Sequence, residues 1–141
     1  MRKNLVICKM IFLTIFALGM EQSTNKIKLK FENKETVVVL NNNGASNDLL
    51  DQLPLELKFE NYGGIEKISY LTKRLNINNS PGSCTPKIYD LTYYSPWGNL
   101  AFFTKDFRTS NGLVPLGKIE SGFENLESID KALKVVIEKI E

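Results

Sequence analysis

The sequence predicts a mainly β protein with one domain, folded as a closed barrel or a sandwich. Short segments alternate apolar and polar residues with a period of two, and turns rich in glycine and proline separate them. Segments with helical spacing are few and short. A length of 141 residues leaves room for one domain, and an apolar share of 43% is ordinary for a globular chain.

Residues 1–20 differ from the rest and are predicted to be a signal peptide. A basic start precedes an apolar run that ends in small residues, and polarity rises directly afterwards. Cleavage near Gly19 or Met20 would give an exported protein, periplasmic or extracellular, without further membrane contact. The alternative is an uncleaved leader that tethers the domain, although Lys9 interrupts a run already short for a spanning helix.

Cleavage would also change the charge. The leader contains Arg2, Lys3 and Lys9, so the remainder carries 15 basic against 16 acidic side chains, a net charge of −1. No basic run survives, and we expect no nucleic-acid partner. The lysines of 26–30 alternate with apolar residues, which indicates the exposed face of a strand.

The domain is expected over residues 26–141. Alternation at 27–31 and a β-branched run at 36–39 predict a hairpin with a polar turn at 33–34. A short helix is expected next, capped by Ser46 or Asn47.

Pro54 ends this helix, because proline cannot continue its hydrogen bonds. Residues 55–59 alternate again, with apolar side chains inward. A Tyr-Gly-Gly turn at 62–64 leads to a strand at 65–71, and 76–87 reads as a long loop.

Three further strands are predicted at 88–94, 99–103 and 112–120. The tail combines helical spacing with a β-branched run, so a short helix at 123–129 followed by a final strand through 135–137 satisfies both signals.

The composition excludes several chemistries. The chain has no histidine, which removes Ser-His-Asp and Cys-His catalysis and His-ligated zinc. Cys84 would be the one cysteine left after cleavage, so an internal disulfide or a thiolate metal site is excluded. No neighbouring cation favours its thiolate, and we interpret it as inert. We expect no catalytic residue, no metal and no cofactor.

Two charged residues are candidate polar anchors of a site. In a regular strand Glu66 and Lys67 point to opposite faces, so one of them borders an apolar face. A carboxylate there needs a partner or a shifted pKa, which is one mark of a site. The alternative is a solvated strand end beside the turn at 62–64.

Aromatic residues are dense between 89 and 107, on both faces of the predicted strands. Phe102 is most simply core. Tyr94, Trp97 and Phe103 are predicted to line a binding groove, since tyrosine and tryptophan combine apolar area with a polar group. The alternative is that these rings only close one end of a barrel.

The order of four motifs resembles the bacterial cyclophilin-like domain family. These motifs are DQLPLELKF, YGGIEKISYL, IYDLTYYSPWGNLAFFTKDF and GLVPLGKIESG. The resemblance covers 26–141 and implies a closed β-barrel of about eight strands with one or two short helices, including a strand at 134–140. It does not imply prolyl isomerisation, because the Phe-His-Arg motif of true cyclophilins is absent and only Arg74 and Arg108 remain after cleavage.

The function predicted from these observations is non-catalytic binding of a small molecule or short peptide. One alternative is weak prolyl isomerase activity, in which Arg74 or Arg108 would stabilise the twisted amide. Another is a structural or interaction module without a small ligand.

Overall fold

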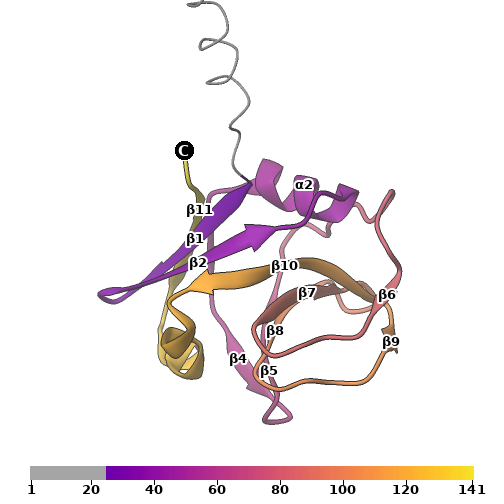
Figure 1. The fold of residues 1–141 in the computed structure, drawn as a ribbon. Coiled ribbons are helices and arrows are strands. Elements are labelled where there is room, and N and C mark those ends of the chain that lie inside the picture. Colours follow the sequence, from indigo (N-terminus) through magenta and orange to yellow (C-terminus); the bar gives the residue numbers. More distant parts are fainter. Residues whose placement is uncertain (1–24) are drawn as a thin grey trace, which may run out of the picture.

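The computed structural model describes residues 25–141, and the predicted leader lies outside this range. Within it, nine antiparallel strands form one strongly curled sheet (Figure 1), in the order β3-β11-β1-β2-β10-β7-β8-β5-β4. Two short helices complete the fold. The predicted mainly β, cyclophilin-like fold is confirmed.

The strands of the sheet are β1 (Lys26–Phe31), β2 (Lys34–Leu40), β3 (Leu55–Leu57), β4 (Glu60–Tyr62), β5 (Glu66–Tyr70), β7 (Asp90–Tyr94), β8 (Asn99–Phe103), β10 (Leu113–Ser121) and β11 (Val135–Lys139). Two very short strands pair separately, namely β6 (Ser83–Cys84) and β9 (Ser110–Asn111). The helices are α2 (Gly44–Gln52) and the 3-10 helix η2 (Phe123–Lys131).

The sheet does not close by hydrogen bonding, which corrects the expectation of a closed barrel of about eight strands. Its end strands β3 and β4 do not pair with each other, and only Lys58 and Phe59 separate them along the chain. The strand predicted at 55–59 therefore ends at Leu57, and the next strand, β4, begins beyond it and forms the other end of the sheet. The hydroxyl of Ser69 donates to the Lys58 carbonyl at 2.8 Å and links this crossing segment to β5.

The core lies inside the curl of the sheet. Along each strand, side chains that point into this core alternate with side chains that point outward, as the period of two in the sequence predicts. Phe102 belongs to this core, as expected, together with Leu91, Tyr93 and Leu100.

A second, smaller cluster lies on the outer face of β5, β8 and β10. It consists of Ile68, Ala101, Phe103 and Leu113. Every residue of β8 is buried, because the segment 104–112 packs over the outer face. Aromatic residues on both faces of this strand therefore serve two separate apolar clusters.

The helix α2 begins one turn earlier than predicted. Its cap is Asn43, whose side chain accepts a hydrogen bond from the Ser46 amide at 2.9 Å, so the prediction of Ser46 or Asn47 as cap was wrong. Ser46 is instead buried, and its hydroxyl donates to the Leu116 carbonyl. The tail was predicted to form a short helix followed by a strand, and η2 and β11 confirm this order.

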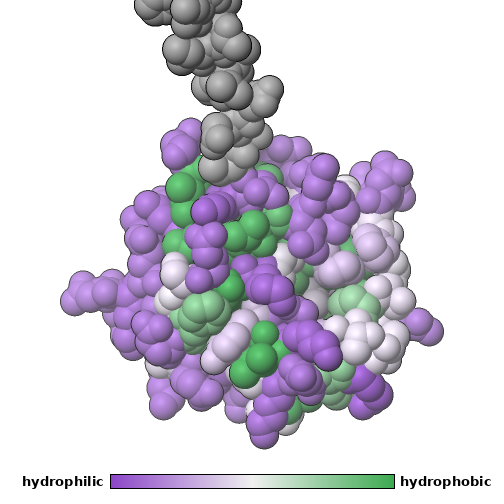
Figure 2. Space-filling model, viewed as in Figure 1, coloured by the Kyte–Doolittle hydropathy of each residue, from purple (hydrophilic) through white to green (hydrophobic). Residues whose placement is uncertain are grey.

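The surface seen in Figure 2 is mostly hydrophilic, with hydrophobic residues in separate patches. Neither helix in residues 25–141 has the length and apolarity needed to cross a bilayer.

Candidate functional site

A cavity of about 290 Å³ lies on the outer face of the sheet, between β4, β5, β7, β8 and the segment 104–112. Its volume is near the lower end of the ~300–1,000 Å³ typical of small-molecule sites. A wider hollow of about 580 Å³ lies beside Lys28, Pro54 and Glu138, but no aromatic side chain lines it. The smaller cavity is therefore the better candidate site.

Three aromatic rings form one wall of this cavity, which we call the aromatic wall. The ring centroids of Tyr62 and Trp97 are 5.7 Å apart, and those of Tyr94 and Trp97 are 5.4 Å apart. Both pairs meet edge to face, an arrangement that aromatic rings favour. Trp97 is 46% exposed and Tyr62 45%, so the wall presents ring surface to solvent.

The turn between β7 and β8 holds Trp97 in this wall. The amides of Trp97 and Gly98 both donate to the Tyr94 carbonyl, at 3.2 and 2.9 Å. Gly98 has φ +75°, a left-handed conformation that glycine adopts without strain. The guanidinium of Arg74 donates to the Ser95 carbonyl at 2.9 Å, which fixes the turn to the segment that carries Arg74.

Glu66 and Asn99 are the polar groups on the sheet side of the cavity. Burial raises the pKa of the half-buried Glu66 carboxyl. Asn99 is buried, and its side-chain amide donates to the Leu100 carbonyl at 3.1 Å. Its oxygen Oδ1 has no hydrogen-bond partner among residues 25–141.

Arg108 lies on the loop side of the cavity. Its guanidinium carbon is 4.5 Å from the centroid of the Phe107 ring, and Phe107 stacks on Phe103 with centroids 5.7 Å apart. The segment 104–112 is held at its middle and at its end, because the amide of Phe107 donates to the Pro86 carbonyl and that of Gly112 to the Gly82 carbonyl. This packing holds the exposed Arg108 cation at the same cavity that the aromatic wall lines.

The structure brings three of the five predicted site residues together, namely Glu66, Tyr94 and Trp97. Phe103 is fully buried beneath the cavity and packs under Phe107 rather than lining the space. Lys67 points to the opposite face of β5, because successive strand residues alternate. The ligand-binding role of these residues stays a prediction.

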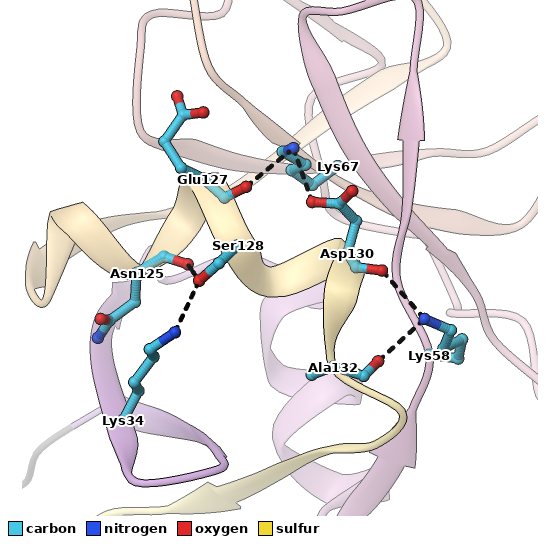
Figure 3. A network of polar contacts seen from close by, with 8 residues as sticks. All are labelled: Lys34, Lys58, Lys67, Asn125, Glu127, Ser128, Asp130 and Ala132. Atoms are coloured by element: carbon cyan, nitrogen blue, oxygen red, sulfur yellow. Dashed lines mark hydrogen bonds and ion pairs between the residues drawn. The ribbon is translucent and has the colours of Figure 1, made fainter.

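Lys67 is engaged in a separate polar network (Figure 3). Its side chain is 8% exposed, and Nζ lies 2.8 Å from the Asp130 carboxylate and 3.4 Å from the Glu127 carbonyl. The ammonium of Lys58 donates to the carbonyls of Asp130 and Ala132 at 3.0 Å each. These contacts attach η2 to the sheet, so Lys67 has a structural role.

Sequence reasoning did not assign Tyr62, Asn99 or Phe107 to the site, and it considered Arg108 only for the isomerase alternative. Tyr62 carried a usable signal, because a hairpin across the turn at 62–64 places it opposite Glu66. Arg108 carried none, since a loop of irregular conformation brings it to the cavity.

Cys84 is half-buried beside the outer cluster. Burial, with a smaller contribution from the negative charge of Asp90, raises the pKa of its thiol to about 11. The thiol therefore stays protonated at neutral pH, as an inert cysteine would.

We predict that Cys84 reacts slowly with thiol reagents. Compared with a thiol of pKa 9.0, a pKa of about 11 leaves about 100-fold less thiolate at neutral pH. Reaction with a disulfide reagent should therefore be slow in the folded Cys8→Ser variant and should accelerate strongly on unfolding in guanidinium. Equal rates in both states would contradict the burial of this thiol.

We predict that Glu66→Gln stabilises the protein at neutral pH. The raised pKa means that the folded state holds the Glu66 proton more tightly than the unfolded chain. The stability linked to this proton is complete below the ordinary pKa of 4.5 and is lost as the pH rises through the folded-state pKa. Urea unfolding should show a larger gain for the variant at neutral pH than below pH 4.5; a loss of stability at neutral pH would contradict the prediction.

Within residues 25–141, His, Cys, Asp and Glu side chains form no group of three that could hold a metal ion.

Comparison with known proteins identifies the family. Residues 29–138 match the model of the Cyclophilin-like family, which confirms the resemblance seen in the sequence. The chain is also similar to the solution structure of a hypothetical protein from Archaeoglobus fulgidus, with a TM-score of 0.64 and 19% identity over 86% of this chain and 100% of that one. At this identity the likeness concerns the fold alone. No curated protein matches the chain.

Proposed function

The chain belongs to the cyclophilin-like family, and we propose that it is an exported, non-catalytic domain that binds a small molecule or a short peptide. One observation carries this proposal. The aromatic wall faces a cavity that also contains a half-buried carboxylate, Glu66, and a guanidinium, Arg108. Concave sites with apolar walls and a few convergent polar groups are the usual form of ligand pockets.

The exposure of the aromatic wall supports binding over a purely structural role. A ring that only closes a barrel end gains most by complete burial, as Phe102 does. Nearly half of Trp97 and of Tyr62 remains accessible, although both rings contact another ring. A ligand that covers these rings would bury this remaining apolar surface.

The proposed export rests on the sequence of residues 1–20, with its basic start, apolar run and small residues near Gly19. Comparing the mass of the secreted or periplasmic protein with that of the full chain tests this proposal. Loss of about twenty residues is expected from the position of the cleavage signal. A full-length protein retained in the membrane fraction would favour the tethered alternative.

Trp97 gives a direct test of binding, because it is the one tryptophan of the chain. Small molecules and short peptides should be screened by calorimetry, and each hit tested for a change in tryptophan fluorescence. A ligand of this cavity should alter the emission and should bind more weakly to Tyr62→Ala and Tyr94→Ala. Saturable binding that leaves the emission and both variants unaffected would place the ligand elsewhere.

Weak prolyl isomerase activity is a second candidate, favoured by the position of Arg108 in the cavity. Arg74 instead supports the turn beside Trp97 through its bond to Ser95. A protease-coupled assay with proline peptides should then show catalysis that Arg108→Ala abolishes and Arg74→Ala largely retains. A rate equal to uncatalysed isomerisation, which takes tens to hundreds of seconds, would exclude this activity.

A further inference from the structure

The cavity contains two opposite charges that do not neutralise each other. Glu66 and Arg108 both line it, yet no ion pair joins them or joins either of them to another side chain in residues 25–141. Burial is the cause of the raised pKa of Glu66, and no nearby cation offsets it. Arg108 contacts the face of Phe107, where its guanidinium hydrogen-bond donors stay available.

The aromatic wall adds a preference for a cation on the side of Glu66. Tyr62 lies directly opposite Glu66 in the pairing of β4 with β5. Tyrosine and tryptophan attract ammonium groups through the negative potential of their ring faces. The rings of the wall meet edge to face, so their faces point in different directions.

Asn99 adds a buried hydrogen-bond acceptor at the edge of the cavity. The donor end of its amide is held by the Leu100 carbonyl, which fixes Oδ1 as the end without a partner. Asn99 lies opposite Tyr94 in the pairing of β7 with β8, at the foot of the aromatic wall. A buried acceptor without a donor is costly, and a small rotation of this side chain toward the cavity would let a ligand N–H remove that cost.

We propose that this cavity binds a small zwitterion of the size of a free amino acid, with its ammonium group between Glu66 and the aromatic wall and its carboxylate on Arg108. The inference rests on the proposed binding function and names its ligand class. A ligand without an ammonium group would leave the half-buried Glu66 carboxylate unpaired, and a ligand without a carboxylate would forgo the contact with the exposed Arg108 guanidinium. A volume of about 290 Å³ suits an amino acid better than a long peptide.

The test begins with calorimetric titration of the protein with each of the common amino acids. The best binder is then compared with two analogues that keep its side chain. One is the amine that lacks the carboxylate, and the other is the acid that lacks the amino group. For leucine these are 3-methylbutylamine and 4-methylpentanoate. The amino acid should bind at least about tenfold more tightly than either analogue, because each analogue loses one charge-assisted contact.

Two charge-neutralising variants assign each end of the ligand. Glu66→Gln should weaken binding of the amino acid and the amine, and leave binding of the acid unchanged. Arg108→Gln should weaken binding of the amino acid and the acid, and leave binding of the amine unchanged. Glu60→Gln and Lys105→Gln are matched controls, because these charges lie nearby without lining the cavity, and both should bind like the original protein.

The unaltered protein keeps the proposal falsifiable even if a variant fails to fold. The proposal of a zwitterionic ligand would be overturned if no amino acid binds, or if an amino acid and one of its analogues bind with equal affinity. If another compound then changes Trp97 emission, the proposed binding function stands without this ligand class. If no compound of the wider screen does so, both proposals fail.

Discussion

Replacing Asp130 with alanine should lower the free energy of unfolding by about 3 kcal/mol, because it leaves the buried Lys67 ammonium without the half-buried carboxylate that pairs with it. Within residues 25–141, only the Glu127 carbonyl, at 3.4 Å, would then remain in hydrogen-bonding range of the buried Lys67 ammonium. The loss should be measured by urea unfolding at neutral pH. It has a matched control in Glu56→Ala, which breaks an exposed pair with Lys134.

The control should cost at most about 1 kcal/mol, because both partners of the Glu56–Lys134 pair are more than 60% exposed. A double-mutant cycle with Lys67→Met adds a second check. The combined variant should lose less stability than the sum of the single changes, since no unpaired charge remains in it. An Asp130→Ala variant as stable as Glu56→Ala would show that Lys67 gains no stability from its partner.

The stability lost in Asp130→Ala should depend on pH and should be smaller in acid than at neutral pH. The hydrogen bond from Lys67 is the main cause of the lowered pKa of the Asp130 carboxyl. The stability that this carboxylate provides is therefore present above its ordinary pKa of 3.8 and lost as the pH falls through the folded-state pKa. The difference between Asp130→Ala and the original protein should shrink in acid.

Phe103→Ala and Phe102→Ala should each cost about 3–5 kcal/mol, the usual range for a buried phenylalanine. The two rings are neighbours in β8 and both are buried, but they face different clusters. Only Phe103 supports Phe107, and through it the segment that carries Arg108. We expect Phe103→Ala to loosen this segment and Phe102→Ala to leave it in place.

Limited trypsin digestion separates these two effects without any ligand, because trypsin cuts after lysine and arginine. Cleavage after Lys105 or Arg108 should be faster in Phe103→Ala than in Phe102→Ala at matched overall stability. Two variants of equal overall stability are cut equally often through global unfolding, so a difference between their cleavage rates reports local opening of the segment. Equal cleavage rates would show that Phe103 does not hold the segment.

Local patterns were sufficient to predict most strands and to separate their faces. Alternation placed Glu66 and Lys67 on opposite sides of one strand, and both turned out to be partly or fully buried. The sequence did not show what covers each side. A 3-10 helix more than fifty residues away pairs with Lys67, and the cavity receives Glu66.

The remainder of the site depends on packing that leaves no periodic signal. Arg108 belongs to a segment between strands, held by backbone contacts to Pro86 and Gly82. The pair β6 and β9 lies within segments that looked like loops, since each strand has only two residues. Such features arise from contacts distant in sequence, which propensity and alternation do not record.

The interruption between β3 and β4 has a consequence for aggregation. An unpaired strand edge can recruit another chain, and a fully closed barrel removes this risk. Here each free edge is only three residues long, and Glu56 and Glu60 place an exposed acidic side chain in each. The domain therefore keeps an incompletely closed sheet while offering a second copy little edge on which to extend it.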